Sequence, residues 1–75
     1  MPMNVPSVNP QLRKILRGVA TDVVFQYVPM TDVPFYNADF YYDDEYDNEQ
    51  SKKEMSTEEA RALWNSLVKR GFNRL

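Results

Sequence analysis

The chain has 75 residues, a length that allows one domain and a small hydrophobic core. It contains no cysteine and no histidine, which excludes disulfides, iron–sulfur clusters and catalysis by thiol or imidazole groups. A zinc site would have to consist of carboxylates alone, and no glycine-rich loop is present to hold a phosphate group. We therefore expect no enzyme activity, no catalytic residue, no cofactor and no bound metal.

The net charge of −2 hides a strong segregation of charge along the chain. Residues 1–21 carry three basic and no acidic side chains, residues 22–50 carry eight acidic and no basic ones, and residues 51–75 carry six basic and three acidic ones. An acidic block between two basic ends can close on itself. This pattern lacks the dominant basic face of a nucleic-acid-binding protein, and no apolar run approaches the length of a membrane span.

Residues 1–8 contain two prolines and no hydrophobic periodicity, so we expect a flexible arm there. Asn9 and Pro10 are typical of a helix start, because asparagine caps the first turn and proline fits the first helical position. Three apolar residues follow and Gly18 supplies a stop, which predicts a short N-terminal helix over residues 10–17. Two helical turns are unstable in isolation, so this helix would depend on tertiary contacts.

Residues 19–42 are rich in β-branched and aromatic side chains, a composition typical of β-strands. In the first part, Val23, Phe25 and Tyr27 would face one side of a sheet. Prolines and aspartate within residues 29–34 favour a connection. We expect an aromatic β-hairpin or extended segment over residues 19–42, covered by the C-terminal part of the chain because two strands alone are marginally stable.

Residues 43–55 are polar and strongly acidic at their start, which predicts an acidic linker that acts as a hinge or is disordered. Four carboxylates alternate along this segment, and on a strand they would line one face and imitate a phosphate backbone: Asp43, Glu45, Asp47 and Glu49. A calcium loop of the EF-hand type is disfavoured, because Asn48 stands where such a loop requires glycine.

The last twenty residues contain the best-defined helix of the chain. Ser56 and Glu59 have the spacing of a capping box, and Gly71 is typical of the residue that ends a helix. Between them we expect an amphipathic C-terminal helix over residues 57–70. Its apolar stripe recurs at helical spacing and consists of Ala60, Leu63, Trp64, Leu67 and Val68.

This apolar stripe has two interpretations. It can pack on the rest of the chain, which has little other apolar surface with which to build a core. Alternatively, Trp64, Leu67 and Phe72 can anchor in a groove of a partner protein. We favour the first interpretation, which leaves the end of the helix, residues 69–75, as a secondary contact site.

Together these elements predict a small α+β protein. Its elements would be a short N-terminal helix at 10–17, an aromatic β-hairpin or extended segment at 19–42, an acidic linker at 43–55 and an amphipathic C-terminal helix at 57–70. We expect residues 9–75 to form a single small domain.

Eight of the ten aromatic residues lie between Phe25 and Tyr46, beside the acidic block. Tyrosine is favoured at interfaces because it offers a large rigid ring with a polar tip. We therefore expect a non-enzymatic protein-binding module, such as an adaptor, an inhibitor or a small accessory subunit, whose acidic tyrosine-rich surface binds a basic partner protein. The predicted contact residues are Tyr36, Phe40, Tyr41, Tyr42, Asp43, Asp44, Glu45, Tyr46 and Asp47, with Trp64, Leu67 and Phe72 as a second set.

Two other functions stay open. The chain can be an acidic DNA mimic that inhibits a nucleic-acid-binding protein, or a structural or assembly subunit of a larger complex such as a viral particle. In all three cases we expect no direct binding to nucleic acid or membrane, and an oligomer is compatible with each. Because the chain lacks cysteines and its first residues do not resemble a secretory signal, we expect a cytoplasmic location.

Overall fold

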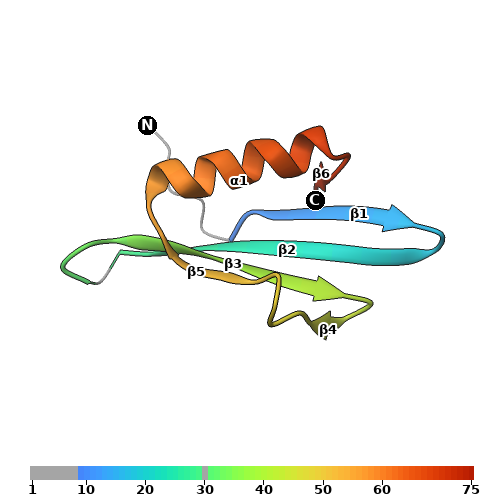
Figure 1. Ribbon diagram of the computed structural model, residues 1–75, viewed down its shortest axis with the longest axis horizontal. Helices are drawn as coiled ribbons and strands as arrows, with labels where there is room; N and C mark the ends of the chain where they lie inside the picture. Colours follow the sequence, from blue (N-terminus) through green and yellow to red (C-terminus); the bar gives the residue numbers. More distant parts are fainter. Residues whose placement is uncertain (1–8, 30) are drawn as a thin grey trace.

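The computed structural model describes residues 9–29 and 31–75, which form an antiparallel sheet with one helix on one of its faces (Figure 1). The strands are β1 (Gln11–Leu16), β2 (Val19–Val28), β3 (Phe35–Tyr42), β4 (Glu45–Tyr46), β5 (Lys52–Met55) and β6 (Asn73–Arg74), and the helix is α1 (Thr57–Lys69). The order across the sheet is β4–β3–β2–β1–β6, and β5 also pairs with β3. In this described part of the chain no helix is long and apolar enough to cross a membrane. The expected arm at residues 1–8 lies outside the described residues.

The predicted N-terminal helix over residues 10–17 is wrong, because strand β1 occupies this segment. Leu12 lies opposite Val23 of β2, and both side chains are fully buried. Arg17 and Gly18 then form a two-residue turn with φ angles of 54° and 80°, typical of a type I′ hairpin. The residue that ends a helix and the second residue of this turn both need a positive φ, which favours glycine. Gly18 therefore fits a helix end and a hairpin turn equally well. Pairing with β2 outweighs a two-turn helix that has little stability of its own.

The predicted pairing of the aromatic segment is confirmed by β2 and β3, which run antiparallel from the Thr21–Tyr42 pair to the Val28–Phe35 pair. These two strands are not a separate hairpin, however. They are the centre of the sheet, with β1 on one side and with β4 and β5 on the other. The predicted fold class is therefore wrong: the described residues form a six-stranded antiparallel sheet with one helix, rather than two helices and a hairpin.

The predicted acidic linker over residues 43–55 is also wrong, because this segment consists of tight turns and the strands β4 and β5. The Ser51 hydroxyl accepts a hydrogen bond from the Phe40 backbone N–H at 2.9 Å and donates one to the Asp47 carbonyl at 2.7 Å. The Asp47 backbone N–H donates to the Phe40 carbonyl at 2.7 Å. These bonds satisfy the backbone of β3 and of the loop together, which orders a polar segment that buries little apolar surface.

Strand β5 carries a β-bulge that interrupts the edge of the sheet. Its pairing with β3 shifts in register between Tyr36 and Ala38. Glu54 adopts a φ of 58°, and its backbone N–H donates to the side-chain oxygen of Asn37 at 3.0 Å. The following residue, Met55, turns into the core at the entrance to α1.

The predicted C-terminal helix is confirmed by α1, which ends one residue earlier than expected. The Ser56 hydroxyl accepts from the Glu59 backbone N–H at 3.1 Å, and the Glu59 carboxylate accepts from the Ser56 backbone N–H at 2.9 Å, which completes the capping box. At the other end, Gly71 has a φ of 97° and the Phe72 N–H donates to the Leu67 carbonyl at 3.0 Å. This is the Schellman ending that places Phe72 under the helix.

The hydrophobic core lies between α1 and one face of the sheet. The stripe of α1 packs on this chain, with Leu67 fully buried and the Trp64 ring edge-on to Phe25 at 5.2 Å between centroids. The buried apolar side chains of the described residues are Leu12, Val23, Phe25, Ala38, Phe40, Met55, Ala60, Leu67 and Phe72. Helix α1 and every strand except the two-residue strands β4 and β6 therefore contribute side chains to the core.

Helix α1 is shorter than the sheet that it covers. Its 13 residues span about 20 Å, whereas the ten residues of β2 span about 34 Å. The helix runs along the strands, so the sheet extends past it at both ends (Figure 1). The turns that join β1 to β2 and β3 to β4 both lie at the end beyond the C-terminus of α1, and this end of the sheet is left uncovered.

Replacing Leu67 with alanine tests whether the stripe of α1 belongs to the core. We expect Leu67→Ala to lower the free energy of unfolding by about 2–5 kcal/mol, because the leucine is completely buried. The neighbouring change Val68→Ala is the control, since Val68 is 48% exposed and alanine favours helix. Urea denaturation followed by circular dichroism compares the two variants. Equal stability of both variants would contradict the assigned core.

The capping box predicts a pH dependence of stability. Hydrogen bonds from the Ser56 backbone N–H and, second, the Ser56 hydroxyl lower the pKa of Glu59 below its ordinary value. The folded pKa is thus below the unfolded one, so the stabilisation is present above the ordinary glutamate pKa of about 4.3 and is lost as pH falls through the folded pKa. We expect wild type to melt higher than Glu59→Gln at pH 7 and equally at the lowest pH. A melting difference that does not change with pH would contradict this assignment.

Candidate functional site

A tight hairpin with acidic and aromatic side chains stands at the uncovered end of the sheet. We call residues 41–46 the acidic hairpin; they include the end of β3, a two-residue turn and β4. Asp43 and Asp44 form the turn with φ angles of 52° and 67°, and this type I′ geometry suits aspartate better than most other residues. The Asp43 N–H donates to the Ala20 carbonyl at 2.9 Å, so the turn is fixed to β2 as well.

The tyrosines of the acidic hairpin lie on both of its faces. Tyr41 and Tyr46 are paired across β3 and β4, and their rings meet edge to face with centroids 5.5 Å apart. Tyr42 pairs with Glu45 and lies on the side of the sheet that carries α1. Tyr42 is 57% exposed and Tyr46 is 43% exposed. Folding therefore leaves large, rigid aromatic surface in solvent beside three exposed carboxylates.

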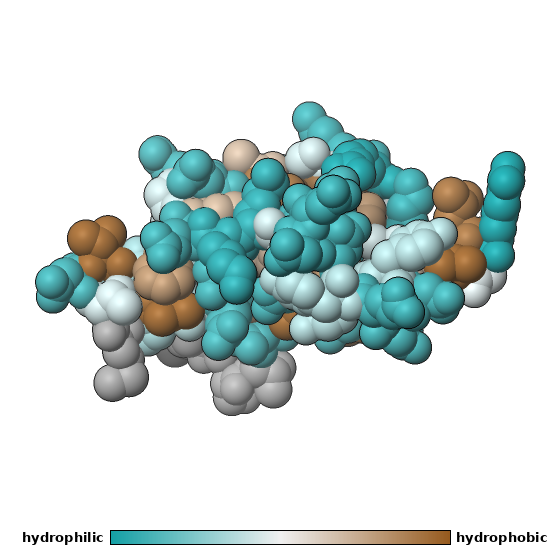
Figure 2. All heavy atoms as spheres, turned by 60° about the horizontal axis from the view of Figure 1, so that its bottom comes forward, coloured by the Kyte–Doolittle hydropathy of each residue, from teal (hydrophilic) through white to brown (hydrophobic). Residues whose placement is uncertain are grey.

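The neighbouring turn between β1 and β2 combines apolar and basic side chains. Ile15 and Leu16 are 62% and 65% exposed, and Arg17 follows them in the turn. A side chain added at Gly18 would meet nothing within 4 Å, so the turn projects freely from the sheet. Figure 2 shows hydrophobic residues gathered towards the two ends of the long axis, whereas most of the visible surface between them is hydrophilic.

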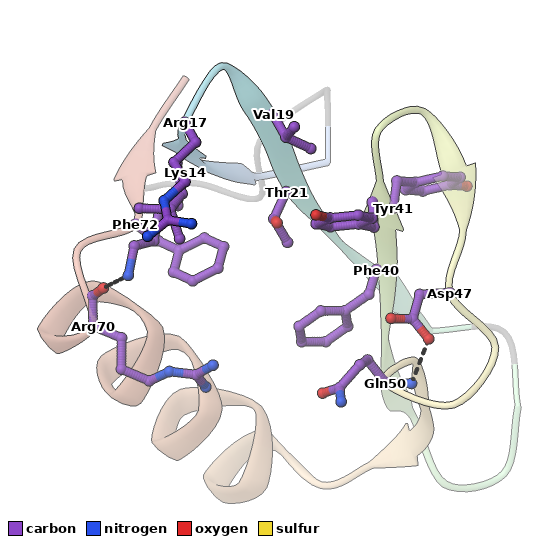
Figure 3. Close-up of a pocket in the computed structure, with 12 residues that line it drawn as sticks. Lys14, Arg17, Val19, Thr21, Phe40, Tyr41, Asp47, Gln50, Arg70 and Phe72 are labelled. Carbon is purple, nitrogen blue, oxygen red and sulfur yellow. Dashed lines mark hydrogen bonds between the residues drawn. The ribbon is translucent and has the colours of Figure 1, made fainter.

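A groove of about 580 Å³ lies on the α1 side of the sheet, between the β1–β2 turn, the C-terminus of α1 and the loop after β4 (Figure 3). Val19 and Thr21 of β2 line it between two unlike sides. One side is basic and carries Lys14, Arg17 and Arg70 together with the Phe72 ring. The other side carries Phe40, Tyr41, Tyr42, Asp47 and Gln50.

The basic side of the groove is built around the end of α1. The Lys14 ammonium donates to the Arg70 carbonyl at 2.7 Å, where it meets the negative end of the helix dipole. The Lys14 Nζ and the Arg70 Cζ lie 6.0 and 5.9 Å from the centroid of the Phe72 ring, within the range of cation–π contacts. Of the described carboxylates, none forms a salt bridge with Lys14, Arg17 or Arg70. Among the described residues, the charge of the basic side is therefore not neutralised by a salt bridge.

Asp47 has a structural task at the opposite side of the groove. One of its carboxylate oxygens accepts hydrogen bonds from the backbone N–H groups of Glu49 and Gln50, both at 3.1 Å. This arrangement caps the turn that leads from β4 to β5. Asp47 is also less exposed than the three acids of the acidic hairpin. Its carboxylate thus stabilises the loop while the residue also lines the groove.

An ion pair on the other face of the sheet joins the basic N-terminal segment to the acidic block. Arg13 donates from Nε and Nη2 to the two carboxylate oxygens of Asp22, at 2.6 and 3.1 Å. This bidentate contact, and a smaller attraction from Asp44, raise the pKa of Arg13 above its ordinary value. Asp22 is buried beneath the guanidinium, so this acid is not part of an exposed acidic surface.

The structure separates the predicted contact residues into exposed and buried groups. Exposed are Tyr42, Asp43, Asp44, Glu45 and Tyr46, all in the acidic hairpin, while Tyr41 is partly buried. Phe40, Leu67 and Phe72 lie in the core, and the partly buried Tyr36 and Trp64 pack against it. Of the second predicted contact set, Leu67 and Phe72 are thus buried in this chain's own core, and Trp64 covers part of it.

The four alternating carboxylates do not share one strand face. Asp43 lies in the type I′ turn, Glu45 in β4, Asp47 in the capped loop and Glu49 in the turn that follows. A strand conformation over the whole segment was the condition for a row of charges with phosphate-like spacing. That condition is not met, and the remaining acidic cluster is the compact tip of the acidic hairpin.

The sequence predicted only part of the basic side of the groove, since the secondary contact site at residues 69–75 includes Arg70 and Phe72 but neither Lys14 nor Arg17. Lys14 and Arg17 were assigned to a helix, and Arg70 is more than fifty positions away in the chain. The pairing of β1 with β2 and the Schellman ending bring the three cations together. The basic run around residues 13–17 was the signal in the sequence that could have indicated Lys14 and Arg17.

Comparison with known protein families, with curated proteins and with solved structures finds no match to this chain. Inference of a function therefore depends on which side chains the fold exposes and on the charges that they carry. At the acidic hairpin, exposed carboxylates lie beside Tyr42 and Tyr46, and at the basic side of the groove exposed cations lie beside Leu16.

Two substitutions at Asp47 separate its structural task from its charge. We expect Asp47→Ala to lower the free energy of unfolding by about 1 kcal/mol, because two backbone N–H groups lose their acceptor. Asp47→Asn keeps an acceptor oxygen and removes the charge, so its stability should stay close to wild type. Thermal denaturation measures both changes. If Asp47→Asn were as unstable as Asp47→Ala, the charge rather than the cap would be decisive.

Proposed function

We propose that the protein is a non-enzymatic binding module that holds a basic partner protein through the acidic hairpin. The observation that carries this proposal is the joint exposure of Tyr42 and Tyr46 on a rigid turn with three exposed carboxylates. A small protein with few apolar side chains gains stability by burying its aromatic rings. Tyrosines that remain in solvent on an ordered hairpin are therefore suited to contact another molecule.

The geometry of the hairpin supports recognition with little loss of conformational entropy. The type I′ turn, the bond from Asp43 to Ala20 and the edge-to-face contact of Tyr41 with Tyr46 hold the backbone and two rings in place before binding. A preorganised contact surface binds more tightly than a flexible segment of the same composition.

The charge of the acidic hairpin defines the chemistry of the partner. No salt bridge within the described residues involves Asp43, Asp44 or Glu45, so these carboxylates favour lysine and arginine side chains on a second protein. The tyrosine rings add apolar contact area and can stack on arginine guanidinium groups. The absence of cysteine from the sequence supports a cytoplasmic setting for this interaction.

Affinity capture with matched variants tests the proposal. The full chain, the double variant Tyr42→Ser/Tyr46→Ser and the control Val33→Ser serve as baits at equal concentration. Val33 is 77% exposed in the loop between β2 and β3, so the control removes exposed apolar surface far from the acidic hairpin. We expect a basic protein to be retained by wild type and control, and to bind the double variant at least about 30-fold more weakly, as for interface tyrosines that contribute 2 kcal/mol or more.

The salt dependence of the captured complex is the second readout. Binding to a carboxylate-rich surface should weaken as ionic strength rises, because salt screens exposed charges. Replacing Asp44 and Glu45 by Asn and Gln should remove most of this salt dependence. Retention of the same proteins by wild type and by the Tyr42→Ser/Tyr46→Ser variant would refute the proposed contact surface.

A further inference from the structure

The uncovered end of the sheet is divided into a basic half and an acidic half. The basic half consists of the three cations of the groove, two of them in β1 and its turn. The acidic half consists of the three exposed carboxylates of the acidic hairpin, at the end of β3 and in β4. Because the strand order is β4–β3–β2–β1, these halves lie side by side across the sheet. Apolar surface from Leu16, Val19 and Tyr42 lies among these charges on the α1 side.

A surface of this kind is complementary to itself. If two copies meet end to end about a two-fold axis, the basic half of each faces the acidic half of the other, and both pairs of opposite charges form at once. The exposed leucine and tyrosine then meet across the axis, where they can exclude water. This pairing requires a two-fold axis normal to the sheets, because an axis in the plane of the sheets and across the strands would place like charges opposite each other.

From this arrangement we infer that a second copy of the chain is a partner of the acidic hairpin, in a two-fold dimer formed through the uncovered ends of the two sheets. The inference rests on the proposed function, since it uses the same hairpin as the contact surface. It adds the receiving surface, which is the basic side of the groove. In the dimer, Arg17 of each copy lies against the acidic hairpin of the other, and Leu16 lies against Tyr42.

The dimensions of the molecule predict that this dimer is weak. The principal extents are 41 × 28 × 20 Å, and the long axis follows the strands, so the end that carries both turns is the small cross-section (Figure 1). Contacts of this size belong to complexes that bury less than about 1,200 Å² in total. We therefore expect dissociation in the micromolar range or above, with affinity that falls as salt concentration rises.

Charge reversal provides the test, measured on the full chain by sedimentation equilibrium at low salt. Arg17→Glu and Glu45→Arg each place like charges against each other at both contacts of a two-fold dimer. Each single variant should therefore associate at least about tenfold more weakly than wild type. An equimolar mixture of the two variants should form a heterodimer, because one contact then has the reversed pair and the other the native pair. The double variant in one chain should dimerise again.

The control variant is Arg61→Glu, which makes the same charge change at an exposed position of α1 away from the uncovered end. It should dimerise like wild type. Circular dichroism of every variant establishes that the fold is intact. The salt dependence of wild-type association is a readout that needs no substitution, and it should show dissociation as salt is added.

Three outcomes would overturn the inference: wild type that stays monomeric over the whole concentration range, single variants that associate as well as wild type, or a variant mixture that does not recover. The proposed function is tested separately. A monomeric chain that still captures a basic protein through Tyr42 and Tyr46 would leave the proposed function intact and refute the dimer. A dimer that survives with no such capture would show a second copy to be the sole partner found for the hairpin.

Discussion

The mismatch in length between one helix and the sheet beneath it determines most of what this protein exposes. Helix α1 can seal the middle of the sheet, where Leu67 and Trp64 meet the aromatic rings of β2 and β3. It cannot reach the sheet ends, because a helix advances less than half as far per residue as a strand. The residues at the uncovered ends therefore depend on tight turns and hydrogen bonds for their order, and their side chains remain available for contacts.

The fold pairs some of the segregated charges of the sequence and keeps others apart. Where β1 and β2 lie side by side, Arg13 and Asp22 close on each other and neutralise part of the difference between the segments. At the uncovered end of the sheet, the three cations of the groove lie on the β1 side, whereas the carboxylates of the acidic hairpin lie at β3 and β4. A chain with a small net charge thus separates opposite charges at one end of its sheet, and the proposed contacts depend on this separation.

The features of the fold that depend on neighbouring residues were predictable from the sequence. The capping box at Ser56 and the Schellman ending at Gly71 each depend on a few adjacent residues, and α1 was predicted accurately from them. The order of residues 43–55 depends on the hydrogen bond that the Ser51 hydroxyl accepts from the Phe40 N–H of β3, which no local pattern reveals. For the same reason the exposed tyrosines of the candidate site were predictable from composition, whereas the cations of the groove meet only through strand pairing and the helix end.

The left-handed bulge at Glu54 has a consequence for how copies of this protein can associate. A regular outer strand would offer a continuous row of free backbone groups, on which further chains could add as in a fibril. The bulge, the two-residue strand β4 and the charged residues around them break that row along the β3 side. Assembly by strand addition along this edge is thereby discouraged, which favours closed complexes over open-ended ones on this side of the sheet.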